Sequence, residues 1–164
     1  MVRSLRDRML AGPAGVERPF TAEEMIEFAR SVDLGTCDMT DYCSFKKGSY
    51  SRNRVHLNDH FELVVICWEQ GQASSIHDHG VSNCLYLVLE GEMAEEEFEL
   101  GPDGMPREKG LNTFTRGELT IVSGDHVHRI LNRASERLVT IHMYSPPLDE
   151  AVTHYTPVPT YVGE

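Results

Sequence analysis

The sequence predicts an all-β domain, a barrel or a sandwich, preceded by a short helical arm. From Tyr50 onward, apolar and β-branched residues come in short runs that turn residues separate. A helical pattern is confined to the first third of the chain. Many short strands at this spacing are typical of all-β barrels and sandwiches. The 164 residues suit a single domain of this kind.

The helical pattern lies in the N-terminal arm, residues 1–47. Thr21 and Glu24 have the spacing of a capping box, in which the Thr21 hydroxyl accepts a hydrogen bond from the Glu24 backbone N–H. Apolar residues then follow at helical spacing, namely Met25, Phe28, Ala29 and Val32. Gly35 offers a stop to this helix. A shorter helix is also expected around Leu5–Leu10.

The β domain is expected to span residues 48–147, because no linker interrupts them. Five runs are expected to be strands: Phe61–Trp68, Cys84–Leu89, Leu119–Val122, Val127–Leu131 and Leu138–Tyr144. Clusters of Asn, Asp, Gly and Ser between them are turn signals. The tail, residues 148–164, carries Pro157 and Pro159 and is expected to run extended over the surface.

Composition and charge exclude several classes of function. Lys and Arg number 15 against 26 Asp and Glu, so the net charge of −11 lacks the basic footprint of proteins that bind nucleic acid or anionic membranes. No apolar run approaches the roughly 20 residues of a membrane span, and the N-terminus lacks the apolar core of a secretion signal. The four cysteines form no CxxC pair, which favours free thiols in a reducing cytoplasm. Without a heptad repeat, a monomer is expected.

The histidines carry the first functional signal. His77 and His79 are two residues apart, and on a strand such residues point to the same face, so two imidazoles converge as metal ligands must. The segment reads Gly71-x5-His77-x-His79-x4-Cys84-x6-Gly91. This resembles the first motif of the cupin superfamily, in which the Cys84 position usually holds a glutamate ligand.

A later segment resembles the second cupin motif and indicates a third ligand. Its spacing is matched by Gly117, His128 and Asn132. Ser123 and Asp125 replace the usual proline and glycine. His126 would share a strand face with His128, but the motif spacing selects His128. The resemblance implies a cupin-type β-barrel, also called a double-stranded β-helix.

Three neutral imidazoles without a carboxylate leave the charge of a divalent metal uncompensated. They also leave about three positions open on an octahedral ion, whereas a closed structural zinc site needs a fourth ligand. Imidazole suits iron, zinc, copper and nickel alike. The missing glutamate therefore favours a metal that binds an anionic substrate directly and has room for another ligand such as O2.

Two further groups are placed to serve such a site. His142 and Tyr144 form another pair two residues apart, so Tyr144 can donate its phenol to a metal-bound ligand while His142 orients it. The alternative is a buried tyrosine with a satisfied hydroxyl. Arg52 can bind a substrate carboxylate through its guanidinium fork, or it is an ordinary surface charge.

Taken together, these segments resemble the thiol dioxygenases, specifically the cysteine dioxygenases. The matching segments are Tyr50–Asn53, Cys67–Trp68, Ser74–His79, Cys84, His128–Arg129 and His142–Pro147. The resemblance implies that His77, His79 and His128 hold Fe(II). It also implies that L-cysteine chelates this iron through thiolate and amine, that O2 takes the remaining place, and that the product is cysteine sulfinate.

The same resemblance implies roles for the remaining site residues. Arg52 would clamp the substrate carboxylate with Tyr50 assisting, and Tyr144 would hydrogen-bond within the active site. In animal members the Cys84 position is joined by a thioether bond to the Tyr144 position, so this crosslink is possible here. The turn after Tyr144 resembles the family's cis peptide turn, which places the cis bond at Ser145–Pro146.

Three alternatives stay open from the sequence. A 3-mercaptopropionate dioxygenase would share the three histidines, but such enzymes usually carry glutamine at the Arg52 position. A non-catalytic cupin would bind a metal or small ligand without chemistry, because function lies in the site and not in the fold. A zinc or manganese cupin isomerase would be expected to keep the glutamate that Cys84 replaces.

Overall fold

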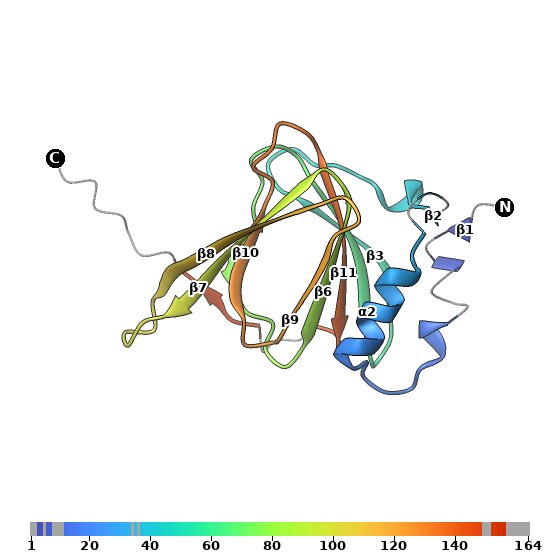
Figure 1. The fold of residues 1–164 in the computed structure, drawn as a ribbon, viewed down its shortest axis with the longest axis horizontal. Coiled ribbons are helices and arrows are strands. Elements are labelled where there is room, and N and C mark those ends of the chain that lie inside the picture. Colours follow the sequence, from blue (N-terminus) through green and yellow to red (C-terminus); the bar gives the residue numbers. More distant parts are fainter. Residues whose placement is uncertain are drawn as a thin grey trace.

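The computed structural model describes residues 3–4, 6–7, 12–33, 35, 37–148 and 152–156. Two five-stranded antiparallel sheets face each other and enclose an interior (Figure 1). The first sheet has the order β3-β4-β11-β6-β9, and the second has the order β12-β5-β10-β7-β8. This architecture confirms the all-β fold class that the sequence predicts.

The first sheet consists of β3 (Ser51–Leu57), β4 (Glu62–Trp68), β11 (Leu138–Ser145), β6 (Asn83–Glu90) and β9 (Leu119–Val122). The second consists of β12 (His154–Tyr155), β5 (Ile76–His77), β10 (Val127–Leu131), β7 (Glu92–Leu100) and β8 (Pro106–Thr115). Two short strands, β1 (Arg3–Ser4) and β2 (Cys37–Asp38), pair in parallel beside the barrel. Among the described residues, the helical elements with defined bounds are α2 (Ala22–Ser31) and the 3-10 turns η1 (Pro13–Gly15) and η2 (Thr40–Tyr42).

Helix α2 begins at the predicted capping box. The Thr21 hydroxyl accepts from the Glu24 N–H at 3.3 Å, and the Glu24 carboxylate accepts from the Thr21 N–H at 2.9 Å. The helix buries Met25, Phe28 and Ala29 on the outer face of the first sheet (Figure 1). Most of the helix expected at Leu5–Leu10 lies outside the described residues. No helix in the described part of the chain is long and apolar enough to cross a membrane.

The central strands of the first sheet are buried on both faces because α2 covers the side opposite the barrel interior. In β4, Leu63, Val65 and Cys67 pack toward the helix. Val64, Ile66 and Trp68 face the interior instead. Strands that are buried on both faces have continuous apolar sequences, which is the pattern that this sequence shows here. Paired residues of neighbouring strands share a face, so the β11 partners of Val64, Ile66 and Trp68 also point inward; these are His142, Thr140 and Leu138. Tyr144, two residues after His142, lies in the same interior cluster.

All five predicted strands form, with bounds within one residue of those expected. The hairpin of β7 and β8 was not predicted. β7 is rich in glutamate, and only part of it is buried, so its sequence lacks an apolar run. The hairpin extends away from the barrel (Figure 1).

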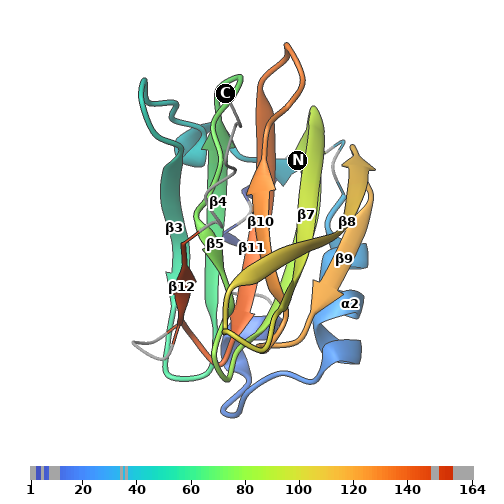
Figure 2. The same ribbon diagram turned by 90° about the vertical axis from the view of Figure 1, so that its left-hand side faces the viewer.

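The C-terminal segment does more than run over the surface. Strand β12 pairs with β5, and His154 lies opposite His77 (Figure 2). The Asp78 carboxylate accepts hydrogen bonds from the Thr153 N–H at 2.9 Å and from the Tyr155 hydroxyl at 2.8 Å. The tail therefore fastens the strand that carries His77, and the residues after 156 lie outside the described part of the chain.

Candidate metal centre and substrate pocket

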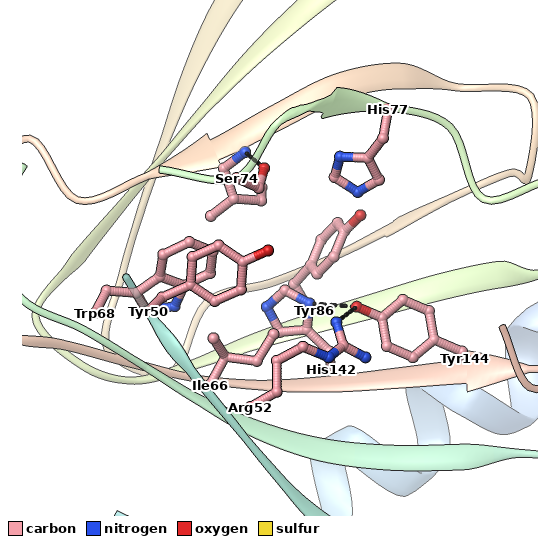
Figure 3. A pocket seen from close by; sticks show the side chains of 10 residues that line it. Tyr50, Arg52, Ile66, Trp68, Ser74, His77, Tyr86, His142 and Tyr144 are labelled. Carbon is pink, nitrogen blue, oxygen red and sulfur yellow. Dashed lines mark hydrogen bonds between the residues drawn. The ribbon is translucent and has the colours of Figure 1, made fainter. Parts of the chain in front are cut away.

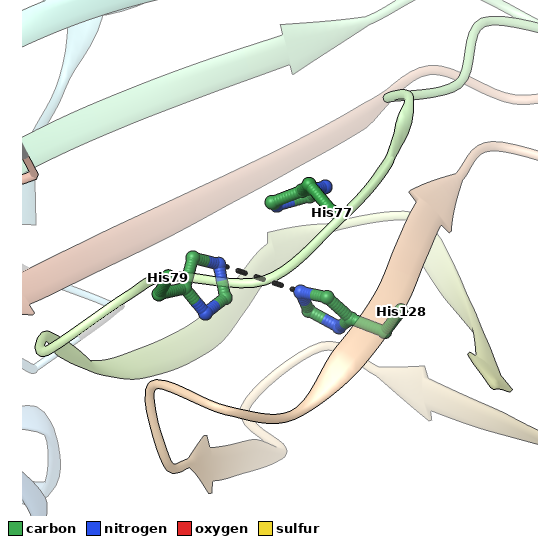
Figure 4. Close-up of side chains that lie close together, drawn as sticks. All are labelled: His77, His79 and His128. Atoms are coloured by element: carbon green, nitrogen blue, oxygen red, sulfur yellow. Dashed lines mark hydrogen bonds between the residues drawn. The ribbon is translucent and has the colours of Figure 1, made fainter. Parts of the chain in front are cut away.

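Three histidines converge between the sheets. The ligand-capable nitrogens of His77, His79 and His128 all lie within 4.8 Å of one another (Figure 4). His77 ends β5 and stands directly opposite His128 of β10. His79 lies two residues beyond the end of β5, and its carbonyl accepts from the Ser82 N–H at 3.0 Å in the turn that follows.

That turn depends on a close approach of two backbone segments. The His79 N–H donates to the carbonyl of Gly124 at 2.7 Å. A Cβ atom on residue 124 would lie 2.0 Å from the carbonyl oxygen of Gly80. Only glycine fits there, so Gly124 fixes how the turn with His79 meets the loop before β10.

Hydrogen bonds set the tautomers of two of the histidines. The His128 Nδ1–H donates to Glu95 at 2.7 Å, and the His77 Nδ1–H donates to the Ser75 carbonyl at 2.8 Å. Each therefore keeps an Nε2 lone pair for a ligand. Although burial raises the pKa of Glu95, the neighbouring imidazoles of His126 and His128 lower it to about 2, so this buried carboxylate stays charged.

The histidines are held neutral, as metal ligation requires. Burial, and then repulsion by neighbouring imidazoles, lowers the pKa of His77 to about 4 and that of His79 to about 2. Nε2 of His79 lies 3.4 Å from Nε2 of His128. Nδ1 of His79 is buried and has no hydrogen-bond partner among the described residues. Nitrogen atoms that face each other in this way fit a shared divalent cation, and imidazole suits several such metals.

His126, the alternative third ligand in the sequence, lies behind the group. Its Nε2 is 3.5 Å from Glu95 and 3.7 Å from Glu97. The neighbouring Glu95 carboxylate raises the pKa of His126, so it is more easily charged than the three converging histidines. His126 thus joins Glu95 on the Nδ1 side of His128, away from the side that faces His79.

A small pocket opens beside the histidines and collects the other candidate residues (Figure 3). Arg52 donates from Nη1 to the Tyr144 hydroxyl oxygen at 3.5 Å and stands over the Tyr144 ring. Arg54 binds Glu62 at 3.1 Å instead and does not line the pocket. The Tyr50 ring packs 4.4 Å from the ring of Trp68, and its hydroxyl is directed into the pocket (Figure 3).

A chain of hydrogen bonds along β11 orients Tyr144. Trp68 can only donate, so its Nε1–H gives a bond to the Thr140 oxygen at 3.1 Å. Nε2 of His142 lies 2.9 Å from the Thr140 hydroxyl oxygen, and Nδ1 lies 3.0 Å from the Tyr144 oxygen, so the imidazole links the two groups. In the tautomer with a hydrogen on Nδ1, Tyr144 accepts from both His142 and Arg52, and its own hydrogen is free for a ligand in the pocket.

Cys84 and Tyr144 are direct partners across β6 and β11. Both side chains are buried, and opposite residues of an antiparallel pair have Cβ atoms about 4.5–5.5 Å apart. Burial raises the pKa of the Cys84 thiol and of the Tyr144 phenol, so both hold their protons in this state. The Ser145–Pro146 bond is cis, as the sequence analysis expects.

Three residues at the site were missed in the sequence. Thr140 and Tyr86 each stand two positions from a residue that was singled out, His142 and Cys84 respectively, so strand alternation could have found them. Glu95 had no such signal, because it lies in a run of glutamates on β7. Only the pairing of β7 with β10 brings it to the histidine group.

Comparison with known proteins identifies the family. The family described as "Cysteine dioxygenase type I" matches residues 17–156 of the chain. The chain belongs to this family. Cysteine dioxygenase type 1 of Rattus norvegicus is 32% identical over 133 residues, which cover 77% of this chain and 66% of the rat protein. The Danio rerio protein of the same description is 31% identical over 139 residues, covering 80% of this chain and 68% of that protein. The chain therefore spans just under two thirds of the rat relative's length.

Solved structures show the same fold at low sequence identity. A conserved protein with a double-stranded β-helix domain from Klebsiella pneumoniae has a TM-score of 0.60 and 16% identity, covering 76% of this chain and 96% of that one. A cupin superfamily protein from Desulfitobacterium hafniense has a TM-score of 0.53 and 13% identity, covering 65% and 86%. These likenesses confirm the predicted cupin-type barrel.

Proposed function

We propose that this chain is a thiol dioxygenase that oxidises L-cysteine with O2 to cysteine sulfinate, at an iron ion held by His77, His79 and His128. The observation that carries the proposal is the convergence of three neutral imidazoles, without a carboxylate, beside a pocket that His77 lines together with a guanidinium and an oriented phenol. Membership of the cysteine dioxygenase type I family supports it.

The charge of the site suits a thiolate substrate. Three neutral imidazoles leave the two positive charges of the ion uncompensated, and the thiolate of cysteine brings a negative charge to it. Bound Fe(II) would supply the place where thiolate and O2 meet and where electrons pass from sulfur to oxygen. Both oxygen atoms go to sulfur, which supplies all four electrons, so no separate reductant is consumed.

Arg52 is the proposed partner of the substrate carboxylate. Its guanidinium lies at the pocket and offers paired N–H donors, which match a carboxylate in a bidentate arrangement. Tyr50 lines the same pocket and offers a hydroxyl as a second donor. A substrate held at its carboxylate by Arg52 and at its sulfur near the three histidines is fixed at both ends.

Tyr144 is the proposed donor to the reacting groups. In the Nδ1–H tautomer of His142, both His142 and Arg52 donate to the Tyr144 oxygen, which leaves the phenol hydrogen for a ligand in the pocket. The Thr140 hydroxyl, 2.9 Å from Nε2 of His142, can donate to that nitrogen and so supports this tautomer. Together these residues place one O–H donor at a fixed point beside the three histidines.

We also propose that Cys84 and Tyr144 become joined by a thioether bond during turnover in the presence of iron and O2. Their opposite placement on β6 and β11 supports this. The bond forms between sulfur and a ring carbon, two hydrogens are lost, and O2 is the oxidant. Activity does not require the crosslink absolutely, because the phenol is oriented by His142 without it.

The first experiment measures O2 uptake by the Fe(II)-loaded protein, with L-cysteine and 3-mercaptopropionate offered in parallel and sulfinate quantified. One O2 consumed per cysteine sulfinate, with little response to 3-mercaptopropionate, supports the proposal. Preference for 3-mercaptopropionate keeps the iron site but overturns the substrate. No uptake with either thiol, in protein shown to hold iron, favours a non-catalytic cupin. The monomeric state and the cytoplasmic location stay predictions from the sequence.

A further inference from the structure

Tyr86 is a buried tyrosine at the histidine group to which the proposed reaction gives no role. It stands on β6, two residues after Cys84 and on the same interior face, and only 1% of it is exposed. Its hydroxyl oxygen lies 2.9 Å from Nε2 of His128 and 3.4 Å from Nε2 of His79. Tyr86 therefore points at the same nitrogen atoms that would hold the metal.

Glu95 determines the direction of this hydrogen bond. Because the Nδ1 hydrogen of His128 goes to Glu95, the Nε2 atom presents a lone pair, and the Tyr86 hydroxyl donates to it. A metal ion bound to Nε2 takes that lone pair away. The Tyr86 hydroxyl then keeps the Cys84 thiol as a polar neighbour, and a thiol sulfur is a weak acceptor. A buried hydroxyl that loses its acceptor is costly, so Tyr86 needs a new partner.

The Tyr86 ring is held in place by its neighbours. It meets the His142 ring edge-on at 4.6 Å and lies 5.5 Å from the His128 ring. Figure 3 shows its hydroxyl directed toward His77. The packing leaves the oxygen beside the metal-binding nitrogens.

The distances match those between ligands of one ion. Bonds of about 2.0–2.1 Å to imidazole nitrogen, as zinc makes, set neighbouring ligands about 2.9–3.4 Å apart at octahedral to tetrahedral angles. The Tyr86 oxygen lies 2.9 and 3.4 Å from its two nitrogens, and those nitrogens lie 3.4 Å from each other. The oxygen thus has the spacing of a further ligand.

We infer that Tyr86 is a fourth protein ligand of the metal when no substrate is bound. The phenol O–H bond breaks, its proton leaves to solvent, and the oxygen binds the ion as phenolate. This supplies one of the negative charges that the three imidazoles lack, from a position two residues beyond the one where cupins usually carry glutamate. The inference rests on the metal site of the proposed function and not on thiol oxidation.

The ligand is exchangeable, because a thiol can replace it without a change in total charge. The sulfur–metal bond replaces the oxygen–metal bond, and the thiol proton returns to the Tyr86 oxygen. Tyr86 then resumes a neutral O–H form inside the pocket. Between turnovers, the Tyr86 oxygen thus occupies the coordination position that the substrate sulfur takes when it binds.

The test uses the full chain, loaded with Fe(II) without O2, oxidised to Fe(III) with ferricyanide and kept free of thiols. Phenolate bound to Fe(III) gives a visible charge-transfer band, and resonance Raman spectra excited in that band show phenolate ring modes. We expect both signals in the wild type, their loss in Tyr86→Phe, and their retention in Tyr144→Phe. Tyr144 is the matched control, because its ring lies 5.7 Å from the His79 ring but its oxygen is held by His142.

Iron content is measured in every sample, and Fe(II) affinity is measured by competition with a chelator. Loss of a direct ligand should weaken affinity at least as much as loss of an outer partner, by about tenfold or more. A wild-type protein that holds iron but shows no phenolate signal overturns the inference, as does a signal that persists in Tyr86→Phe. If Tyr86→Phe does not retain iron, the Raman spectra of the wild type and Tyr144→Phe decide. A phenolate signal without cysteine oxidation would refute the proposed reaction and leave Tyr86 as a ligand.

Discussion

Glu95 offers the sharpest test of how the barrel tunes its histidines. Its carboxylate accepts from the His128 Nδ1–H at 2.7 Å in a buried setting, which fixes the tautomer that presents Nε2. Replacement by glutamine keeps the size and removes the charge. Glutamine can also turn its amide N–H₂ toward Nδ1, which favours the wrong tautomer. Glu95→Gln should therefore weaken metal binding without creating a cavity in the core.

The magnitude follows from the hydrogen bond. Bonds to charged groups contribute about 1.5–3 kcal/mol and neutral ones about 0.5–1.5 kcal/mol, so the substitution removes about 1–1.5 kcal/mol. At about 1.4 kcal/mol per factor of ten, metal affinity should fall about tenfold, at the lower end of the range for outer partners of metal ligands.

The assay is competition for Fe(II) between the protein and a chromogenic chelator at pH 7 without O2. Glu97→Gln is the matched control, since Glu97 is on the same strand and its carboxylate lies 3.7 Å from Nε2 of His126, which is outside the proposed ligand set. We expect its affinity to stay within about twofold of the wild type. Equal affinities for Glu95→Gln and the wild type, or an equal loss in Glu97→Gln, would refute the reasoning.

Three other predictions follow from the same structure. Arg52→Gln should lower kcat/KM for L-cysteine by more than about tenfold, because the substrate carboxylate loses a charge-assisted partner. The control variant Arg54→Gln should leave kcat/KM nearly unchanged. Equal rates for the two variants would remove Arg52 from the substrate site. After many turnovers with iron and O2, intact mass spectrometry should show a loss of two hydrogens that is absent in Cys84→Ser, and an unchanged wild-type mass would exclude the thioether bond to Tyr144. The metal-free protein should lose stability as the pH falls from 7 to 5. Burial lowers the pKa of His77 to about 4 in the folded state, against about 6.5 in the unfolded chain. The unfolded chain therefore binds more protons between pH 7 and 5, and the free energy of unfolding falls by up to about 2 kcal/mol for this imidazole. Urea unfolding at both pH values measures this, and an unchanged free energy would contradict it.

Local pattern in the sequence determined a large part of this protein. The capping box of Thr21 and Glu24 and the apolar spacing behind it define α2, because helix initiation depends on nearby residues. The apolar runs define β4, β6 and β11, because strands buried on both faces must be apolar throughout. Polar residues within those strands, such as His142 and Tyr144 on β11, stood out against that background and marked the site.

Only the tertiary structure decided which groups surround the histidines. Glu95 and Tyr86 look ordinary in the sequence, one in an acidic run and the other in an apolar strand. The pairing of β7 with β10 brings Glu95 to His128, and the interior face of β6 brings the Tyr86 hydroxyl to within 2.9 Å of Nε2 of His128. His79 lies beyond the end of β5, and its N–H is held by the carbonyl of Gly124 in the loop before β10. Ligand types and their spacing are local properties that can be read from the sequence. The tautomer of a histidine, its charge compensation and the direction of a hydroxyl depend on contacts between distant segments. Those contacts exist only once the two sheets have packed together.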